Sequence, residues 1–140
     1  MGKPSYEILE HTADVGLKVY GRTLQELFEN AARGMVALAF GSAGDSGTGM
    51  VSFSAAGSDR EELLVSWLND ILYRMDAEGW TFRDFRVTRI GDEVVEGEGY
   101  GQRQESGGSR RAVPVKAVTF HQISVREIAG GWEAVVYFDI

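Results

Sequence analysis

Few side chains in this sequence have the chemistry of a catalytic centre. Cysteine is absent, and the only histidines are His11 and His121. Disulfides, thiol nucleophiles and thiolate metal sites are therefore excluded. A Ser-His-Asp triad would need one of these histidines as its base, and no serine occupies a GxSxG pattern. The spacings of a phosphate-binding loop, an HExxH helix and an EF-hand loop are also missing, which leaves carboxylates as the groups to consider.

Carboxylates near the two ends of the sequence form the strongest candidate site. The sequence ends in Tyr137–Ile140, directly out of an apolar strand pattern. The Asp139 side chain and the terminal carboxylate of Ile140 are close along the backbone, and the terminal group is not tied to one face of the strand. Two such anions repel each other unless water separates them or a cation bridges them. Asp14, at the end of the polar run 11–14, would supply a third carboxylate.

Together, Asp14, Asp139 and Ile140 would form a hard ligand set made only of oxygen atoms. Such a set suits Ca²⁺, which we expect first, and also Mg²⁺ or Mn²⁺, whereas Zn²⁺ prefers imidazole or thiolate. A plainer interpretation is that the run 11–14 forms a turn and that Asp139 only solvates a strand end. The residues alone leave both interpretations open.

Two amphipathic helices are predicted from local signals. The first is predicted to begin at Thr23, which makes a capping box with Glu26, and its apolar stripe is Leu24, Leu27, Phe28, Ala31, Met35 and Leu38. The second is predicted to begin with Ser58 and Glu61 as another capping box and to end at Gly79, with the apolar stripe Leu64, Trp67, Leu68, Ile71, Leu72 and Met75. We assign both stripes to the core.

The remaining sequence is predicted to form strands and loops. Strand patterns cover residues 15–20, 85–90, 93–95, 115–125 and 132–139, with turn signals at 91–92 and 130–131. The Gly- and Ser-rich segments 41–49 and 97–111 are predicted to be surface loops, and no helix pattern follows the glycines at 97, 99 and 101, so they are no dinucleotide fingerprint. We therefore expect an α+β fold: one compact domain over residues 1–140, in which a mostly antiparallel sheet packs with two main helices.

Composition limits the class of function. The net charge is −7, and the basic residues are scattered apart from Arg103 and the pair Arg110–Arg111. Binding of a phosphate backbone needs clustered Lys and Arg, so no strong direct binding of nucleic acid is expected. The first ten residues lack the apolar segment of a signal peptide, and no apolar run approaches the roughly 20 residues that span a membrane. These features favour a cytoplasmic protein and leave its oligomeric state undetermined.

Four segments of the sequence resemble the archease family. They are His11–Gly16, the helical run Glu62–Leu72, the block Val115–His121 and the ending Phe138–Ile140, and they occur in the order that the family shows. The resemblance implies a compact α+β protein that assists RNA ligases of the RtcB type, which join tRNA halves using GTP and a divalent metal. It implies an accessory protein without catalysis of its own, one that promotes guanylylation of the ligase and so permits multiple turnovers.

The resemblance also implies a metal site and its ligands. Asp14 matches the aspartate of the N-terminal signature, Asp139 the penultimate aspartate, and Ile140 the terminal residue whose carboxylate coordinates. Phe120 departs from the family pattern, in which we expect tyrosine before the histidine, so a phenol has no role there. His121 and Lys116 belong to the C-terminal signature and would lie on opposite faces of a strand if its alternation holds. We assign no catalytic role to His121 or to His11.

Two other classes of function are compatible with the same residues. A metal-dependent hydrolase would use these carboxylates, but it also needs a general base or nucleophile beside the ion, which the sequence does not clearly offer. A general chaperone or scaffold for RNA-modifying enzymes would instead present a large exposed apolar patch.

Overall fold

A computed structural model describes residues 5–10, 14–41, 47–103 and 113–140 of the chain. Within these ranges the elements are β1 (Tyr6–Glu10), β2 (Asp14–Gly21), α1 (Leu24–Phe40), β3 (Gly49–Ala56), α2 (Arg60–Glu78), β4 (Trp80–Ile90), β5 (Val94–Arg103), β6 (Ala117–Ile128) and β7 (Gly131–Asp139). The strands form an antiparallel sheet of order β1-β2-β7-β6 and a second antiparallel sheet of order β3-β5-β4. The predicted α+β fold with antiparallel strands and two main helices is confirmed.

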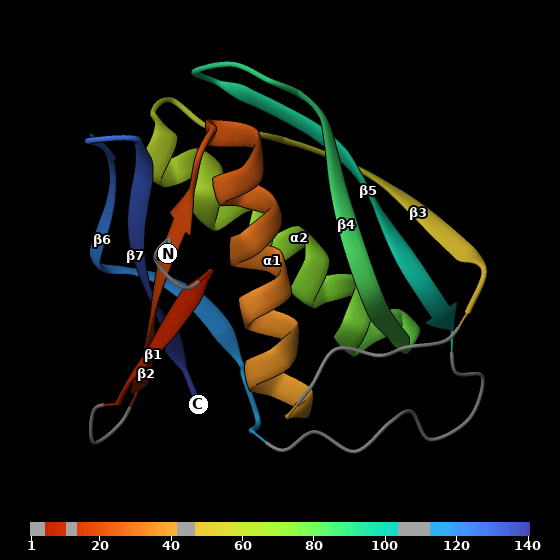
Figure 1. Cartoon of the computed structure of the whole chain (residues 1–140). Helices are drawn as coiled ribbons and strands as arrows, with labels where there is room; N and C mark the ends of the chain where they lie inside the picture. Colours follow the sequence, from red (N-terminus) through yellow and green to blue (C-terminus); the bar gives the residue numbers. More distant parts are fainter. Residues whose placement is uncertain (1–4, 11–13, 42–46, 104–112) are drawn as a thin grey trace.

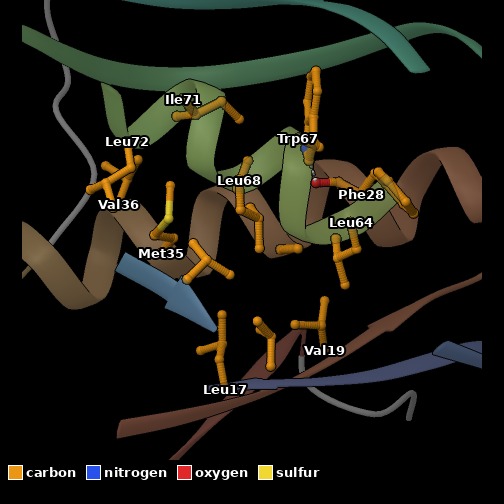
Figure 2. Packing of buried hydrophobic residues seen from close by; sticks show 14 of the residues in the cluster. Leu17, Val19, Phe28, Met35, Val36, Leu64, Trp67, Leu68, Ile71 and Leu72 are labelled. Atoms are coloured by element: carbon orange, nitrogen blue, oxygen red, sulfur yellow. Dashed lines mark hydrogen bonds between the residues drawn. The ribbon is translucent and has the colours of Figure 1, made fainter. Parts of the chain in front are cut away.

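Both helices lie between the two sheets, and the core fills the spaces on either side of them (Figure 1). Leu17 and Val19 point from the four-stranded sheet toward the helices, as Figure 2 shows. On the other side of the helices, the ring of Trp67 meets Phe53 of β3 edge-on, with ring centroids 5.7 Å apart. The indole Nε1 of Trp67 donates a hydrogen bond to the carbonyl oxygen of Phe28 at 3.1 Å, so this one side chain connects α2 with both α1 and the three-stranded sheet.

The helix ends follow from local hydrogen bonds. Thr23 caps α1, because its hydroxyl accepts the backbone N–H of Glu26 at 3.1 Å, as predicted. The prediction for α2 was wrong by one residue: the cap is Asp59, whose carboxylate accepts the backbone N–H of Glu62 at 2.8 Å. Glu62 in turn accepts the backbone N–H of Ser58, the residue before the cap, so the return bond of the capping box is displaced by one residue.

The prediction of a surface loop over 97–111 was wrong where the structure can test it. Residues 97–103 belong to β5, and 104–112, with Arg110 and Arg111, lie outside the described residues. The β5 glycines face inward and let neighbours approach closely: a Cβ placed on Gly97 would lie 2.7 Å from the ring of Trp67, and one on Gly99 would lie 2.8 Å from the ring of Phe82. Glycine is depleted in strands except where another group comes near, which is the case here.

The edge of the four-stranded sheet at β6 is bound by side chains of α2. Asn69 accepts the backbone N–H of Val118 at 3.1 Å and donates its amide to the carbonyl of the same residue at 3.4 Å. Glu61 accepts the backbone N–H of Val125 at 3.0 Å. A helix therefore satisfies edge groups that would otherwise be free to pair with another strand.

The edge of the three-stranded sheet at β4 is bound by α1 in the same way. Glu29 accepts the backbone N–H of Val87 at 2.9 Å, and Arg33 donates to the carbonyl of Phe85 at 3.3 Å. Each helix thus holds the edge of one sheet.

Substitution of Asn69 by alanine tests this arrangement. Both bonds to Val118 would be lost at a partly buried site, and we expect the free energy of unfolding to fall by about 1–3 kcal/mol in denaturant titrations. Tyr73→Ala, one turn further along α2 at a side chain that is 60% exposed, is the matched control. It should change stability by less than about 0.5 kcal/mol. Equal effects of the two substitutions would contradict the role of Asn69.

Candidate metal site at one end of the four-stranded sheet

Asp14 and Asp139 begin and end neighbouring strands, and the strand register brings them opposite each other. In the antiparallel pairing of β2 with β7, Asp14 is the partner of Asp139, and the next pair is Val15 with Phe138. Val15 and Phe138 are buried on the face that packs on the helices. Because side chains alternate along a strand, the two aspartates lie on the opposite, outer face of the sheet, at its end.

The neighbouring row of the outer face is closely packed. The ring of Tyr137 covers Gly16, where an added Cβ would lie only 2.6 Å from a ring carbon. His121 meets the same ring edge-on, with centroids 5.8 Å apart. The Thr119 hydroxyl donates to the carbonyl of Tyr137 at 3.2 Å. Tyr137 and its neighbours therefore form a closely packed group of side chains beside the two aspartates.

The neighbouring strand, β6, and the residue before it also hold the backbone of Asp139. Ala117 of β6 pairs with Asp139, and the backbone N–H of Lys116 donates to the Asp139 carbonyl at 2.8 Å. The side chain of Ile140 packs against the core. The last residues of the chain are thus fixed by backbone bonds and by apolar contact, which leaves the Asp139 carboxylate exposed.

The residues present fit a hard cation. Carboxylates directly opposite each other on antiparallel strands have Cβ atoms about 4.5–5.5 Å apart and repel each other. Among the described residues, no hydrogen bond or salt bridge joins either carboxylate to a basic side chain. A bound cation would remove this repulsion, and the carboxylate oxygens are the donors that Ca²⁺ and Mg²⁺ prefer.

The side chains alone do not complete a metal cage. In the described part of the chain, no cluster of three or more His, Asp or Glu side chains could hold an ion. Asp14 and Asp139 supply two, and His11 lies outside the described residues. Within the described residues, a further ligand would therefore be a main-chain group, and water or a partner could supply others.

Lys116 and His121 were predicted on opposite faces of a strand if its alternation held, and the alternation is interrupted. Lys116 precedes β6, and the pairing of β6 with β7 breaks between Thr119 and Ser124. This bulge places His121 against Tyr137, a contact that the sequence pattern did not indicate. The only hint of this contact in the sequence was the presence of a histidine inside an apolar strand pattern.

A hollow lies at the opposite end of the same sheet. It has a volume of about 350 Å³ and is lined by residues that include Tyr20, Glu26 and Trp132. Its carboxylate is already engaged, because a hydrogen bond from Arg22 holds the pKa of Glu26 below its usual value. A carboxylate with a lowered pKa is a weak general base near neutral pH, so this hollow does not favour hydrolytic chemistry.

No helix among the described residues is long and apolar enough to cross a membrane.

Comparison with known proteins identifies relatives over nearly the whole chain. The model of the archease protein family matches residues 6–140. The archease of Methanosarcina barkeri is 34% identical over 139 residues, covering 96% of this chain and 95% of the relative. The archease of Archaeoglobus fulgidus is 38% identical over 145 residues, covering 96% and 98%.

Solved structures agree with this relationship. The solution structure of protein 1598 of Methanobacterium thermoautotrophicum is 30% identical, with a TM-score of 0.73, covering 97% of this chain and 99% of that one. A crystal structure of an archease from Thermotoga maritima is 24% identical, with a TM-score of 0.61, covering 100% and 98%; it supports the fold alone. From the family match and these relatives we conclude that the chain belongs to the archease family.

Proposed function

We propose that this protein is a metal-binding accessory protein that activates an RtcB-type tRNA-splicing RNA ligase. The proposal is that it promotes guanylylation of the ligase, and hence multiple turnovers, without catalysing a reaction alone. Membership of the archease family supports the accessory role. The observation that carries the proposal for the site is the pairing of Asp14 with Asp139 on the outer face, where two carboxylates meet with no described basic partner.

In this proposal Asp14, Asp139 and the carboxylate of Ile140 would hold a divalent cation, Ca²⁺ first and Mg²⁺ or Mn²⁺ as alternatives. When bound, such an ion supplies positive charge beside GTP phosphates. The chain's own part is to hold the two aspartates in register and to keep Asp139 exposed at the end of the sheet. The net charge of −7 suits this role, because the ligase rather than the accessory protein would supply the positive surface for RNA.

The test measures GTP-dependent labelling and multiple-turnover ligation by the RNA ligase of the same organism. We expect the wild-type protein to raise the number of turnovers, and the double variant Asp14→Asn, Asp139→Asn to lose this effect while remaining folded. Glu93→Gln, which removes one exposed carboxylate elsewhere, is the matched control and should behave as wild type. Metal affinity, measured by calorimetry with Ca²⁺ alone, should fall in the double variant only.

Other outcomes would favour other functions. Full activation by the double variant would remove the metal site from the proposal. Hydrolysis of nucleotides or phosphoesters by the purified protein would favour a metal-dependent hydrolase. Activity on several unrelated enzymes, independent of metal, would favour a general chaperone, the function that the description of the Thermotoga protein names as possible for that protein.

A further inference from the structure

The edge strand β6 carries a large bulge close to the two aspartates. Its pairing with β7 stops at Thr119 opposite Tyr137 and resumes at Ser124 opposite Val135, so residues 120–123 of β6 lie against the single residue Val136. The strand bends sharply near its middle (Figure 1). Bulges re-aim side chains and are common at sheet edges and beside functional sites.

The bulge has an unusual backbone conformation. Gln122 has a φ of 52°, and it is the one non-glycine residue with positive φ in the described ranges. Side chains other than glycine adopt this region at a cost, and such residues persist where the surrounding structure holds them.

Hydrogen bonds on both sides hold the bulge in place. Before it, Asn69 of α2 binds both backbone groups of Val118, and after it, Glu61 of the same helix binds the N–H of Val125. Within it, the backbone N–H of His121 donates to the hydroxyl of Thr119 at 3.3 Å. The bulge is therefore fixed to α2 on both sides, at Val118 before it and at Val125 after it.

This fixed segment presents an apolar ring to solvent. Phe120 is 59% exposed, and the residues that follow it, His121 and Gln122, are also exposed. Burying a phenylalanine side chain in a partner is worth about 1.5–3 kcal/mol, and a backbone that is already held by hydrogen bonds has little further entropy to lose on binding. Aromatic side chains of this kind are often the strongest contacts of a protein interface.

Phe120 is also next to the acidic site. Thr119, which precedes it, pairs with Tyr137, only two residues from Asp139 on β7, a spacing of about 7 Å along a strand. Phe120 and Asp139 are therefore close in the sheet, at the same end of β6 and β7. A partner protein that covers Phe120 at this edge would also lie near the pair of aspartates.

We propose that Phe120 is the docking residue that holds a partner protein beside the acidic site. The partner would have an apolar pocket for one phenyl ring, close to a basic surface that complements the net charge of −7. This inference rests on the proposed function, because it takes the ligase as the partner. A protein is favoured over RNA because the net charge of −7 repels a phosphate backbone.

The test separates docking from activation by titrating the protein against its ligase. We expect Phe120→Ala to raise the concentration for half-maximal stimulation by about 30-fold, as for loss of an interface contact of about 2 kcal/mol, and to leave the plateau unchanged. The double variant Asp14→Asn, Asp139→Asn is expected to lower the plateau instead. Phe120→Leu should lie between wild type and Phe120→Ala, and Tyr73→Ala, at a residue of similar exposure on α2, should match wild type. Circular dichroism and thermal melts establish that each variant is folded.

Direct binding to the ligase, measured by calorimetry, distinguishes failure of this inference from failure of the proposed function. Binding that depends on Phe120 without any stimulation supports docking and overturns the proposed function. Stimulation that is the same for wild type and Phe120→Ala at every concentration overturns docking and leaves the function in place. A defect of Phe120→Ala that appears only when the ligase carries RNA would assign the ring to an RNA contact and overturn the proposal. If the wild type neither binds nor stimulates, both are overturned.

Discussion

Replacement of Trp67 by alanine is expected to lower the free energy of unfolding by about 3–5 kcal/mol, a large part of the stability of a domain of this size. Trp67 is fully buried, and its ring fills the space between α2 and the three-stranded sheet against Phe53. The substitution opens a cavity and also leaves the carbonyl of Phe28 without its indole donor. Both effects act in the same direction.

Denaturant titration followed by circular dichroism measures this loss. Trp67→Phe is the matched comparison, because it keeps an aromatic ring but loses the N–H group, and it should cost less than Trp67→Ala. A loss below about 1 kcal/mol for the alanine variant would mean that the layers are held together elsewhere.

Conversion of the carboxylate of Ile140 into an amide is expected to weaken binding of Ca²⁺ by at least about tenfold, which corresponds to 1.4 kcal/mol. The amide removes one negative charge from the proposed ligand set and adds almost no bulk. The backbone bond from Lys116 to Asp139 and the apolar contact of the Ile140 side chain would remain. The change therefore tests the charge of this group rather than the packing of the strand end.

The amide is made by ligation of a short synthetic C-terminal peptide, and calorimetry with Ca²⁺ alone gives the affinity. The same ligation with an unmodified peptide is the control. A chain extended by a few residues after Ile140 should behave like the amide. Unchanged affinity of both would remove Ile140 from the ligand set and would leave Asp14 and Asp139 as the residues to examine.

The sequence predicted the helices well because their signals are local. The cap at Thr23 depends on a hydroxyl and an N–H three residues apart, and both are visible in the sequence. At α2, Ser58 and Asp59 are both good capping residues, and only the structure decides that Asp59 is used. Errors of one residue are expected where two adjacent residues can cap.

The sequence predicted β5 poorly because its glycines depend on distant residues. Gly97 and Gly99 look like loop residues, yet they make room for rings from α2 and β4 that are far away in the sequence. β1 was missed for a related reason. It has only five residues, which is too short for a clear alternation of apolar and polar residues, and it is defined by its pairing with β2.

The candidate site was partly predictable. Carboxylates near both ends of the sequence suggested one cluster, and the register of β2 with β7 places Asp14 opposite Asp139. The bulge at 120–123 and the contact of His121 with Tyr137 could not be predicted, because a bulge is defined by the pairing of two strands. Metal binding by these residues stays a prediction.

The binding of strand edges by helix side chains has a consequence for association between molecules. The described sheets have four edges. At two of them, β4 and β6, backbone groups are hydrogen-bonded to side chains of α1 and α2, so a strand from another molecule would have to displace these side chains to pair there. The other two edges are β1 and β3. β1 is short and carries Glu7, whereas β3 spans eight residues without a charge or a proline. If a partly unfolded form of this protein assembles by strand addition, fibre formation should therefore start at β3, and a lysine placed there should delay it.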